Sequence, residues 1–229
     1  TLSEVHTLLH EFGHSLHGLL TQTRYSSMSG TNVERDFVEL PSQFMENYLL
    51  QPEVVTELLS KHYQTGEPLP AKLLNKAIQA TQYPVGYSTI RQVIFGKLDM
   101  AYNTLAEGES LPDDLYTYER ETLRGTTLRD RERDPQHPEH IVATAFSHIF
   151  AGGYAAGYYG YKWSEMLATD AFERFSEEGI FSPTVAADFR HQILERGDEL
   201  DPMELYVRFR GRKPTLAAML KRDGITTAN

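Results

Sequence analysis

The segment His10-Glu11-Phe12-Gly13-His14 constrains this chain more than any other because it places two histidines four positions apart with a glutamate between them. On an α-helix, residues four apart lie one turn above each other on the same face. His10 and His14 would therefore point the same way, close enough to bind one metal ion. Glu11 would lie beside the first ligand, where its carboxylate can take a proton from water. This is the arrangement of zinc hydrolases.

Two histidines require a third protein ligand, which leaves one position of a tetrahedral zinc ion open for water. The following segment, residues 34–46, offers the carboxylates of Glu34, Asp36, Glu39 and Glu46. We predict Glu39 because its neighbours Val38 and Leu40 are apolar, which indicates partial burial. A buried carboxylate without a partner costs several kcal/mol, roughly, and a metal ion removes that cost. An ordinary buried ion pair is the alternative for Glu39.

Other polar residues near these positions have less specific interpretations. Asp36, Gln43 and Glu46 could accept or donate hydrogen bonds around the ligands without binding the metal. His6 and His17 share the helix face of the two central histidines, and either could be a ligand. Only the central pair brackets a glutamate in the position of a base, so we interpret His6 and His17 as helix-face or supporting histidines.

A glycine- and tyrosine-rich segment, FSHIFAGGYAAGYYGY at residues 146–161, is the second unusual feature. Tyr154, Tyr158 and Tyr161 have helical spacing, so three phenols would share one face. Phenols are neutral donors near pH 7 and can stabilise the oxyanion formed in amide hydrolysis. His148 could donate as well, or orient the substrate backbone. The alternative is a close-packed helix in which glycine and alanine only permit tight contacts.

Helical periodicity dominates the rest of the chain, and strand signals are sparse, so we expect a mainly α fold. Ser182-Pro183 and Asp201-Pro202 each place a capping side chain before a proline of the first turn. The charged stretch from Arg129 to His140 is typical of a solvated connection. The expected helices are 2–21, 34–50, 52–64, 70–81, 86–107, 112–124, 153–178, 183–196, 202–210 and 214–222.

Composition excludes several classes of protein. The 32 acidic residues outnumber the 22 basic ones among 229, so nucleic acid is not an expected partner. No apolar run reaches membrane-spanning length, so no membrane partner is expected. The absence of cysteine restricts metal ligands to His, Asp and Glu and suits a reducing cytoplasm. The chain opens at Thr1 without an initiator methionine, so we interpret it as a piece of something longer.

Three motifs resemble the thimet oligopeptidase family of zinc metallopeptidases, and its bacterial branch of oligopeptidase A and dipeptidyl carboxypeptidase most closely. HEFGHSLH, at residues 10–17, is similar to the metal-binding helix of the family, and FVELPSQFMEN, at 37–47, to its third-ligand helix. FSHIFAGGYAAGYYGYKWSEML, at 146–167, is similar to its substrate-binding segment. The spacing from His148 to Tyr154 matches the bacterial branch and is one residue longer than in the thimet branch.

The resemblance implies a multi-helix, zincin-like catalytic domain over residues 1–229, the C-terminal part of a longer two-lobed peptidase. In that family a deep channel admits short peptides and excludes folded proteins. The isolated chain would lack most of the opposing wall and the N-terminal part of the same polypeptide, so we expect it to bind one zinc ion with low activity. By position, the resemblance implies His10, His14 and Glu39 as zinc ligands, Glu11 as general base, Tyr154 and Tyr161 as donors, and His148 as a substrate contact.

The sequence therefore predicts zinc-dependent hydrolysis of peptide bonds in short oligopeptides. Two other functions remain open. One is a peptidyl-dipeptidase that releases C-terminal dipeptides, which needs a carboxylate-binding residue that the sequence does not locate. The other is a non-catalytic helical binding module with a vestigial metal site.

Overall fold

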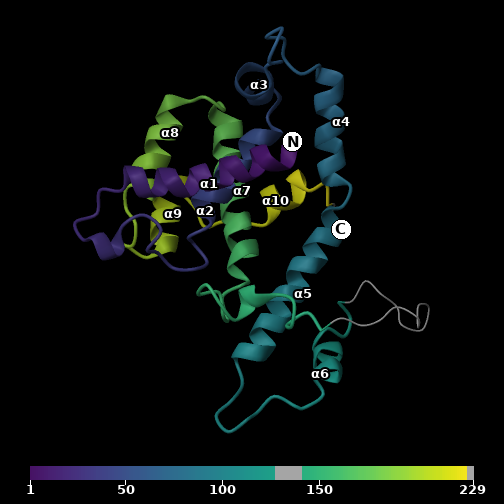
Figure 1. Cartoon of the computed structure of the whole chain (residues 1–229). Coiled ribbons are helices and arrows are strands. Elements are labelled where there is room, and N and C mark those ends of the chain that lie inside the picture. The colour runs from purple at the N-terminus through teal and green to yellow at the C-terminus, as the bar shows by residue number, and fades with distance from the viewer. Residues whose placement is uncertain (127–140, 226–229) are drawn as a thin grey trace. The chain divides into compact units, whose positions relative to one another are not determined.

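The computed structural model describes residues 1–126 and 141–225 of the chain (Figure 1). The connection predicted from Arg129 to His140 lies outside these residues. The chain divides into two compact units. The first comprises Thr1–Tyr83 and Trp163–Asn229, and the second comprises Pro84–Lys162.

Helices form nearly all the regular structure, which confirms the predicted mainly α fold. Within residues 1–126 and 141–225, the only extended pairing is a single antiparallel bridge between Lys61 and Pro68. Short 3-10 or π-helical turns occur at Ser26–Met28, Asn47–Leu50, Val55–Leu59, Ser147–Ile149 and Arg190–Leu194. The α-helices are α1 (Leu2–Leu20), α2 (Leu40–Glu46), α3 (Pro52–Val54), α4 (Ala71–Gln82), α5 (Val85–Asn103), α6 (Leu115–Thr122), α7 (Gly160–Glu178), α8 (Pro183–Phe189), α9 (Pro202–Arg210) and α10 (Ala217–Arg222).

Capping side chains set several helix starts. Ser182 accepts from the backbone N–H of Val185 at the start of α8. Asp201 accepts from the N–H groups of the second and third residues of α9, and both helices place proline in their first turn. Thr1 and Glu4 form a capping box at the start of α1. The starts predicted from Ser182-Pro183 and Asp201-Pro202 are thus confirmed.

The helices predicted from residues 112 and 214 begin three positions later, at Leu115 and Ala217, and two other predicted helices begin much later than expected. The helix predicted from residue 34 begins at Leu40, where proline occupies the first turn. The helix predicted from residue 153 begins at Gly160. Gly152, Gly153 and Ala156 all have positive φ angles, between 54° and 81°, which an α-helix does not accommodate. Residues 153–159 are therefore irregular backbone, and the helical prediction for them was wrong.

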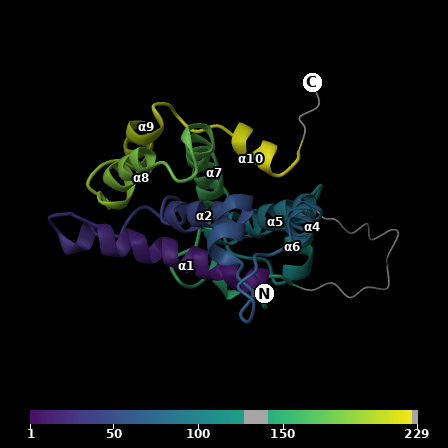
Figure 2. The ribbon, with the colours of Figure 1, turned by 90° about the horizontal axis from the view of Figure 1, so that it is seen from above.

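An aromatic core holds the first unit together. Phe44 of α2 stacks on Phe189 of α8 with ring centroids 4.2 Å apart, and it packs edge-on against Phe175 of α7 at 5.1 Å. Phe209 of α9 packs against Phe189 at 5.2 Å. Such pairs add to the burial of large apolar surfaces. The core thus fixes the position of α2 against α7, α8 and α9, which Figure 2 shows from above.

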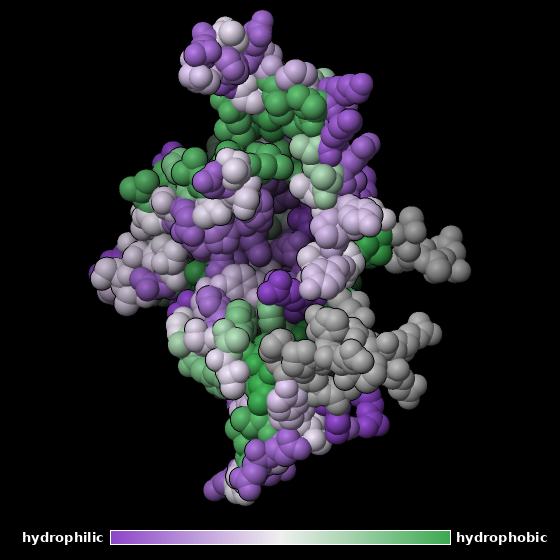
Figure 3. Space-filling model, turned by 45° about the vertical axis from the view of Figure 1, so that its right-hand side comes forward, coloured by the Kyte–Doolittle hydropathy of each residue, from purple (hydrophilic) through white to green (hydrophobic). Residues whose placement is uncertain are grey.

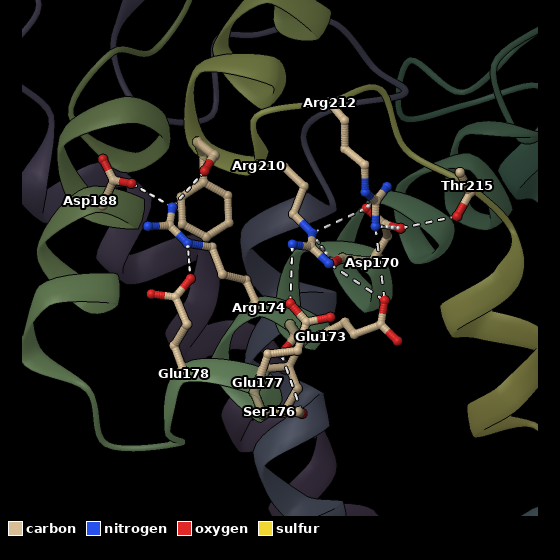
Figure 4. A network of polar contacts seen from close by, with 12 residues as sticks. Asp170, Glu173, Arg174, Ser176, Glu177, Glu178, Asp188, Arg210, Arg212 and Thr215 are labelled. Atoms are coloured by element: carbon tan, nitrogen blue, oxygen red, sulfur yellow. Dashed lines mark hydrogen bonds and ion pairs between the residues drawn. The ribbon is translucent and has the colours of Figure 1, made fainter.

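A polar network complements this core (Figure 4). Asp170 of α7 is fully buried and accepts hydrogen bonds from Tyr206, Arg212 and Thr215, at 2.5, 2.9 and 3.2 Å. Arg210 donates to the carbonyl oxygen of the same aspartate at 3.0 Å. A buried carboxylate is tolerated when its charge and lone pairs are satisfied in this way. These hydrogen bonds hold α9 and the segment that follows it against α7.

The second unit has its own core around α5 and α6. Leu98, Tyr102, Ile149 and Tyr158 are buried there and pack with partly buried neighbours such as Phe146. The segment after residue 141 therefore supplies apolar side chains that pack against α5, which lies much earlier in the chain. This packing brings residues 146–161 against α5.

The surface mixes hydrophilic and hydrophobic residues, as the face drawn in Figure 3 shows. The apolar side chains of α1 are only partly buried. Leu8, Phe12 and Leu19 are 67%, 47% and 78% exposed, while the helix buries Gly13 and His17 instead.

None of the described helices combines the length and apolar character needed to cross a membrane.

Candidate metal centre

Helices α1 and α2 pack against each other at a glycine. A Cβ atom built on Gly13 would lie 2.4 Å from the carbonyl oxygen of Pro41 and 2.5 Å from the Cα of Ser42. Real Cβ atoms do not approach backbone atoms so closely. Only glycine therefore permits this contact, and it sets the first turn of α2 beside the part of α1 that carries His10 and His14.

This contact brings the three predicted ligands together. Oε2 of Glu39 lies 3.3 Å from Nε2 of His10 and 3.1 Å from Nε2 of His14. One ligand atom from each residue falls within 4.8 Å of the others. Glu39 is only 3% exposed. In a tetrahedral site with bonds of about 2.0–2.1 Å, neighbouring ligand atoms lie about 3.3 Å apart. The donor set and its spacing fit a zinc ion.

Ser42 orients the glutamate of this group. Its hydroxyl lies 2.8 Å from Oε2 of Glu39 and 2.9 Å from the carbonyl oxygen of the same residue, and it can donate to either. Ser42 is fully buried, three residues after Glu39 in the first turn of α2. A hydroxyl in this position restricts the rotamers of the carboxylate. No role was predicted for Ser42, although its spacing of three positions from Glu39 was an available signal.

Glu46 orients the first histidine. Its Oε1 accepts from Nδ1 of His10 at 2.6 Å, and its Oε2 lies 3.2 Å from Nε2 of His6. Because Nδ1 of His10 is used in this hydrogen bond, Nε2 is the nitrogen that faces Glu39. The predicted supporting role of Glu46 and His6 thus corresponds to a chain of contacts that runs from His6 through Glu46 to His10.

These contacts hold a positive charge at His10. Hydrogen bonds to Glu39 and Glu46 raise the pKa of His10 to about 10, and the bond to Glu46 raises the pKa of His6. Burial alone would raise the pKa of Glu46, but the hydrogen bonds from the two histidines outweigh burial and lower it. The carboxylates therefore favour either a proton or a metal cation at His10.

His17 has a different environment from His6. It is fully buried, and neither ring nitrogen has a hydrogen-bond partner among the described residues. Burial lowers the pKa of its imidazole to about 4. Nδ1 of His14 is likewise buried without such a partner within the described part of the chain. His17 is therefore a neutral core residue at pH 7, and His6 is the outer histidine that joins the polar contacts.

The other carboxylates of residues 34–46 lie outside the group that could hold a metal ion. Glu34 and Asp36 line a separate pocket of about 280 Å³ that also contains Trp163, Asp201 and Tyr206. Glu11, the predicted base, is exposed on α1 directly after the first ligand. Its position leaves the carboxylate open to solvent.

In the second unit, three of the predicted donors meet as a ring cluster. The ring of Tyr154 stacks on those of His148 and Tyr161, with centroids 4.9 and 5.1 Å apart. Nε2 of His148 lies 3.0 Å from the hydroxyl of Tyr161. Tyr158 is buried instead, and its hydroxyl donates to Oε1 of Gln92 at 2.9 Å. The phenols thus do not share a helix face as predicted; Tyr158 belongs to the core and the others to the cluster.

Similarity to known proteins covers nearly the whole chain. The sequence model of peptidase family M3 matches residues 1–225. Oligopeptidase A from Haemophilus influenzae and from Escherichia coli are each 44% identical to the chain over 98% of its length. Dipeptidyl carboxypeptidase from Escherichia coli is 39% identical over 97%. The chain spans 32% of the length of each of these relatives.

Proposed function

This chain belongs to peptidase family M3, and we propose that it carries the catalytic centre of a zinc-dependent oligopeptidase. The observation that carries the proposal is that one oxygen of the buried Glu39 lies 3.3 and 3.1 Å from the Nε2 atoms of His10 and His14. Similarity to proteins named oligopeptidase A supports the same reaction class.

In this proposal His10, His14 and Glu39 hold the zinc ion, and Glu46 and Ser42 orient two of these ligands. When bound, zinc supplies a Lewis acid that lowers the pKa of water and polarises a carbonyl group. The chain's contribution is to present two ligands from α1 and one from the N-cap position of α2, and to keep the fourth side open.

Glu11 is the proposed general base. It follows the first ligand directly on α1, and its side chain is exposed. It accepts a proton from the attacking water and delivers it to the leaving amine, as a positioned carboxylate does in general acid–base catalysis. This role leaves metal binding to the other three residues.

Tyr154 and Tyr161 are the proposed donors to the oxyanion of the scissile amide, and His148 is the proposed contact to the substrate. Phenols remain neutral donors at pH 7. Their stacked rings and the contact between His148 and Tyr161 support a shared function. A positioned donor to the oxyanion is worth about 10²–10³ in kcat.

We propose short, unfolded peptides as substrates. A second candidate activity, release of C-terminal dipeptides, is favoured by the 39% identity to a dipeptidyl carboxypeptidase. Mass spectrometry of the products from one peptide of intermediate length separates the two. Internal fragments of several lengths indicate an endo-oligopeptidase. Free dipeptides, together with a series of peptides each shortened by two C-terminal residues, indicate a peptidyl-dipeptidase.

The experiment that tests the proposal combines metal analysis with peptide hydrolysis by the full-length protein. We expect one zinc ion per chain. Glu11→Gln should retain the zinc and lose activity by about 10²–10⁴-fold, the contribution of general base catalysis. Glu57→Gln, at an exposed glutamate that is not part of the candidate metal group, is the matched control and should leave the rate unchanged.

The outcomes are distinct. Wild-type protein that binds zinc but cleaves no peptide would favour a non-catalytic binding module. An active Glu11→Gln protein would exclude Glu11 as the base. The isolated chain of 229 residues should bind zinc but turn over slowly, because proximity and orientation supply much of the rate enhancement. Equal activity of the chain and the full-length protein would refute this expectation.

A further inference from the structure

Helix α5 carries a buried charge that the proposed function does not use. Asp99 is fully buried in the second unit, near the C-terminal end of the helix. A carboxylate in such a position costs several kcal/mol, roughly, unless its oxygens are satisfied. Its partners therefore indicate what it holds in place.

Those partners are backbone amides of the tyrosine segment. Oδ1 of Asp99 accepts from the N–H of Ala156 at 2.9 Å, and Oδ2 accepts from the N–H of Tyr158 at 2.8 Å. The amide of Asn103, one turn further along α5, donates to Oδ1 and to the carbonyl oxygen of Ile149, both at 2.9 Å. Asp99 and Asn103 thus tie the backbone on both sides of Tyr154 to one helix.

The tie imposes an unusual backbone on the segment. Ala156 has a φ angle of +54° and is the only residue other than glycine with positive φ in residues 1–126 and 141–225. For an L-residue this conformation costs about 1–2 kcal/mol. It directs the amide of Ala156 to the same carboxylate that binds the amide of Tyr158. Asp99 therefore stabilises a conformation that local sequence preferences do not favour.

The segment held in this way contains Tyr154, the central ring of the cluster. His148 directly precedes Ile149, and Tyr154 lies between the two tied positions. The stacking of Tyr154 on His148 and Tyr161 depends on where this backbone lies. A shift of 1 Å in a catalytic group can lower a rate by about 10²-fold.

We propose that Asp99, assisted by Asn103, is a positioning residue that acts on peptide hydrolysis through Tyr154. The proposal rests on the proposed function, because it assumes that Tyr154 donates to the substrate. It assigns the buried charge to the placement of one phenol and not to the general stability of the unit.

A double-mutant cycle in the full-length protein tests this assignment. Asp99→Asn keeps the size of the side chain but turns one acceptor into a donor that faces a backbone N–H. We expect kcat/KM to fall by about tenfold or more, with kcat falling equally, since the lost interaction belongs to the transition state. In a Tyr154→Phe background the same change should cost less than about threefold, because interacting positions are not additive. Zinc content should stay at one ion per chain.

The second unit provides a matched control. Glu119 of α6 is also buried and also accepts from two backbone amides, those of Val142 and Ala143, at 2.8 and 2.9 Å. It holds a different stretch of backbone. Glu119→Gln should destabilise the protein about as much as Asp99→Asn does. Its effect on kcat/KM should add to that of Tyr154→Phe.

Each outcome is decisive. If Asp99→Asn and Tyr154→Phe are additive in an active enzyme, Asp99 is structural and the inference is wrong while the proposed function stands. If wild-type protein cleaves no peptide, both fail together. If Asp99→Asn does not fold, Asn103→Ala decides. It leaves both amide bonds to Asp99 intact and should lower kcat/KM several-fold, again with little effect beside Tyr154→Phe; additivity there overturns the inference.

Discussion

The candidate metal group and the ring cluster are built by different means. His10 and His14 lie on α1, and Glu39 is the N-cap residue of α2, which touches α1 through a glycine. The cluster around Tyr154 lies on irregular backbone tied to α5 by one buried carboxylate. Helices hold metal ligands to within a few tenths of an ångström, whereas loops adapt to a substrate. The two regions should therefore fail in different ways.

The first region depends on volume, and the second on hydrogen bonds and backbone strain. Adding one methyl group between α1 and α2 should disturb the metal group, whereas the tyrosine segment should respond to changes in its acceptors or its φ angles. Substitutions that leave every functional side chain in place can test this contrast.

The largest effect is expected from Gly13→Ala. Its Cβ would meet backbone atoms of Pro41 and Ser42 at 2.4–2.5 Å, and backbone cannot rotate away. We expect unfolding to become easier by about 3 kcal/mol or more, at or above the usual range for overpacking. Zinc affinity should fall with it. Urea denaturation and competition with a zinc chelator measure both quantities.

Gly18→Ala is the matched control on the same helix. A Cβ at Gly18 has no heavy atom within 4 Å among those described. Alanine should raise stability by up to about 1 kcal/mol through helix propensity. If the two glycine variants behaved alike, close approach of α1 and α2 would not be the basis of the metal group.

His17 makes the helix pair sensitive to pH. Burial lowers its pKa to about 4 from the ordinary value of 6.5. Between these values the unfolded chain binds a proton that the folded chain does not, so stability falls as pH decreases from 6.5 to 4 and then levels off. The contribution of this residue should approach about 3 kcal/mol.

The measurement is urea denaturation of the wild type and of His17→Leu from pH 4 to 8, in the presence of a metal chelator. The difference between their free energies of unfolding separates the contribution of His17 from those of other groups that titrate in this range. The leucine variant should lose less stability at low pH. It should be at least as stable above pH 7, because it removes two nitrogens without partners. Parallel pH curves would show that His17 is not buried as a neutral group.

A smaller effect is expected from Glu46→Gln. The amide keeps an oxygen near Nδ1 of His10 but loses the charge that orients this ligand. Mutation of such a hydrogen-bond partner weakens metal binding by about 10–100-fold. His6→Gln, which changes only the outer contact of Glu46, should weaken binding less. Chelator competition gives both values, and equal affinities for wild type and Glu46→Gln would contradict the role of Glu46.

The same contrast explains which features the sequence could predict. The spacing of His10 and His14 is a property of one helix, and the apolar neighbours of Glu39 indicated its burial, so local patterns were sufficient for these positions. The structure brings these residues together; their metal-binding role stays a prediction. Glu46 was one of several candidates for a supporting role, because its contact with His10 spans 36 positions between two helices.

The tyrosine segment could not be predicted in this way. Tyr154, Tyr158 and Tyr161 match the period of a helix, but the backbone before Gly160 is not helical. The spacing of the tyrosines does not indicate the positive φ angle of Ala156. The contacts of Asp99 with Ala156 and Tyr158 span 57 and 59 positions. Long-range polar contacts of this kind override local preferences, and a single sequence does not show them.

The smallest effect should come from Ala156→Gly, and its sign matters more than its size. Glycine adopts positive φ without strain but loses more entropy on folding, so the two terms partly cancel. We expect a net gain in stability of about 0.5–1 kcal/mol. Ala155→Gly, one position earlier and without positive φ, should lower stability slightly. Urea denaturation of both variants compares strain at adjacent positions of the same segment. If glycine at position 156 were destabilising, the loop would prefer its conformation unaided. Asp99 would then not be needed to stabilise the positive φ angle at Ala156. The contrast between a region fixed by packing and one fixed by a buried carboxylate would be lost.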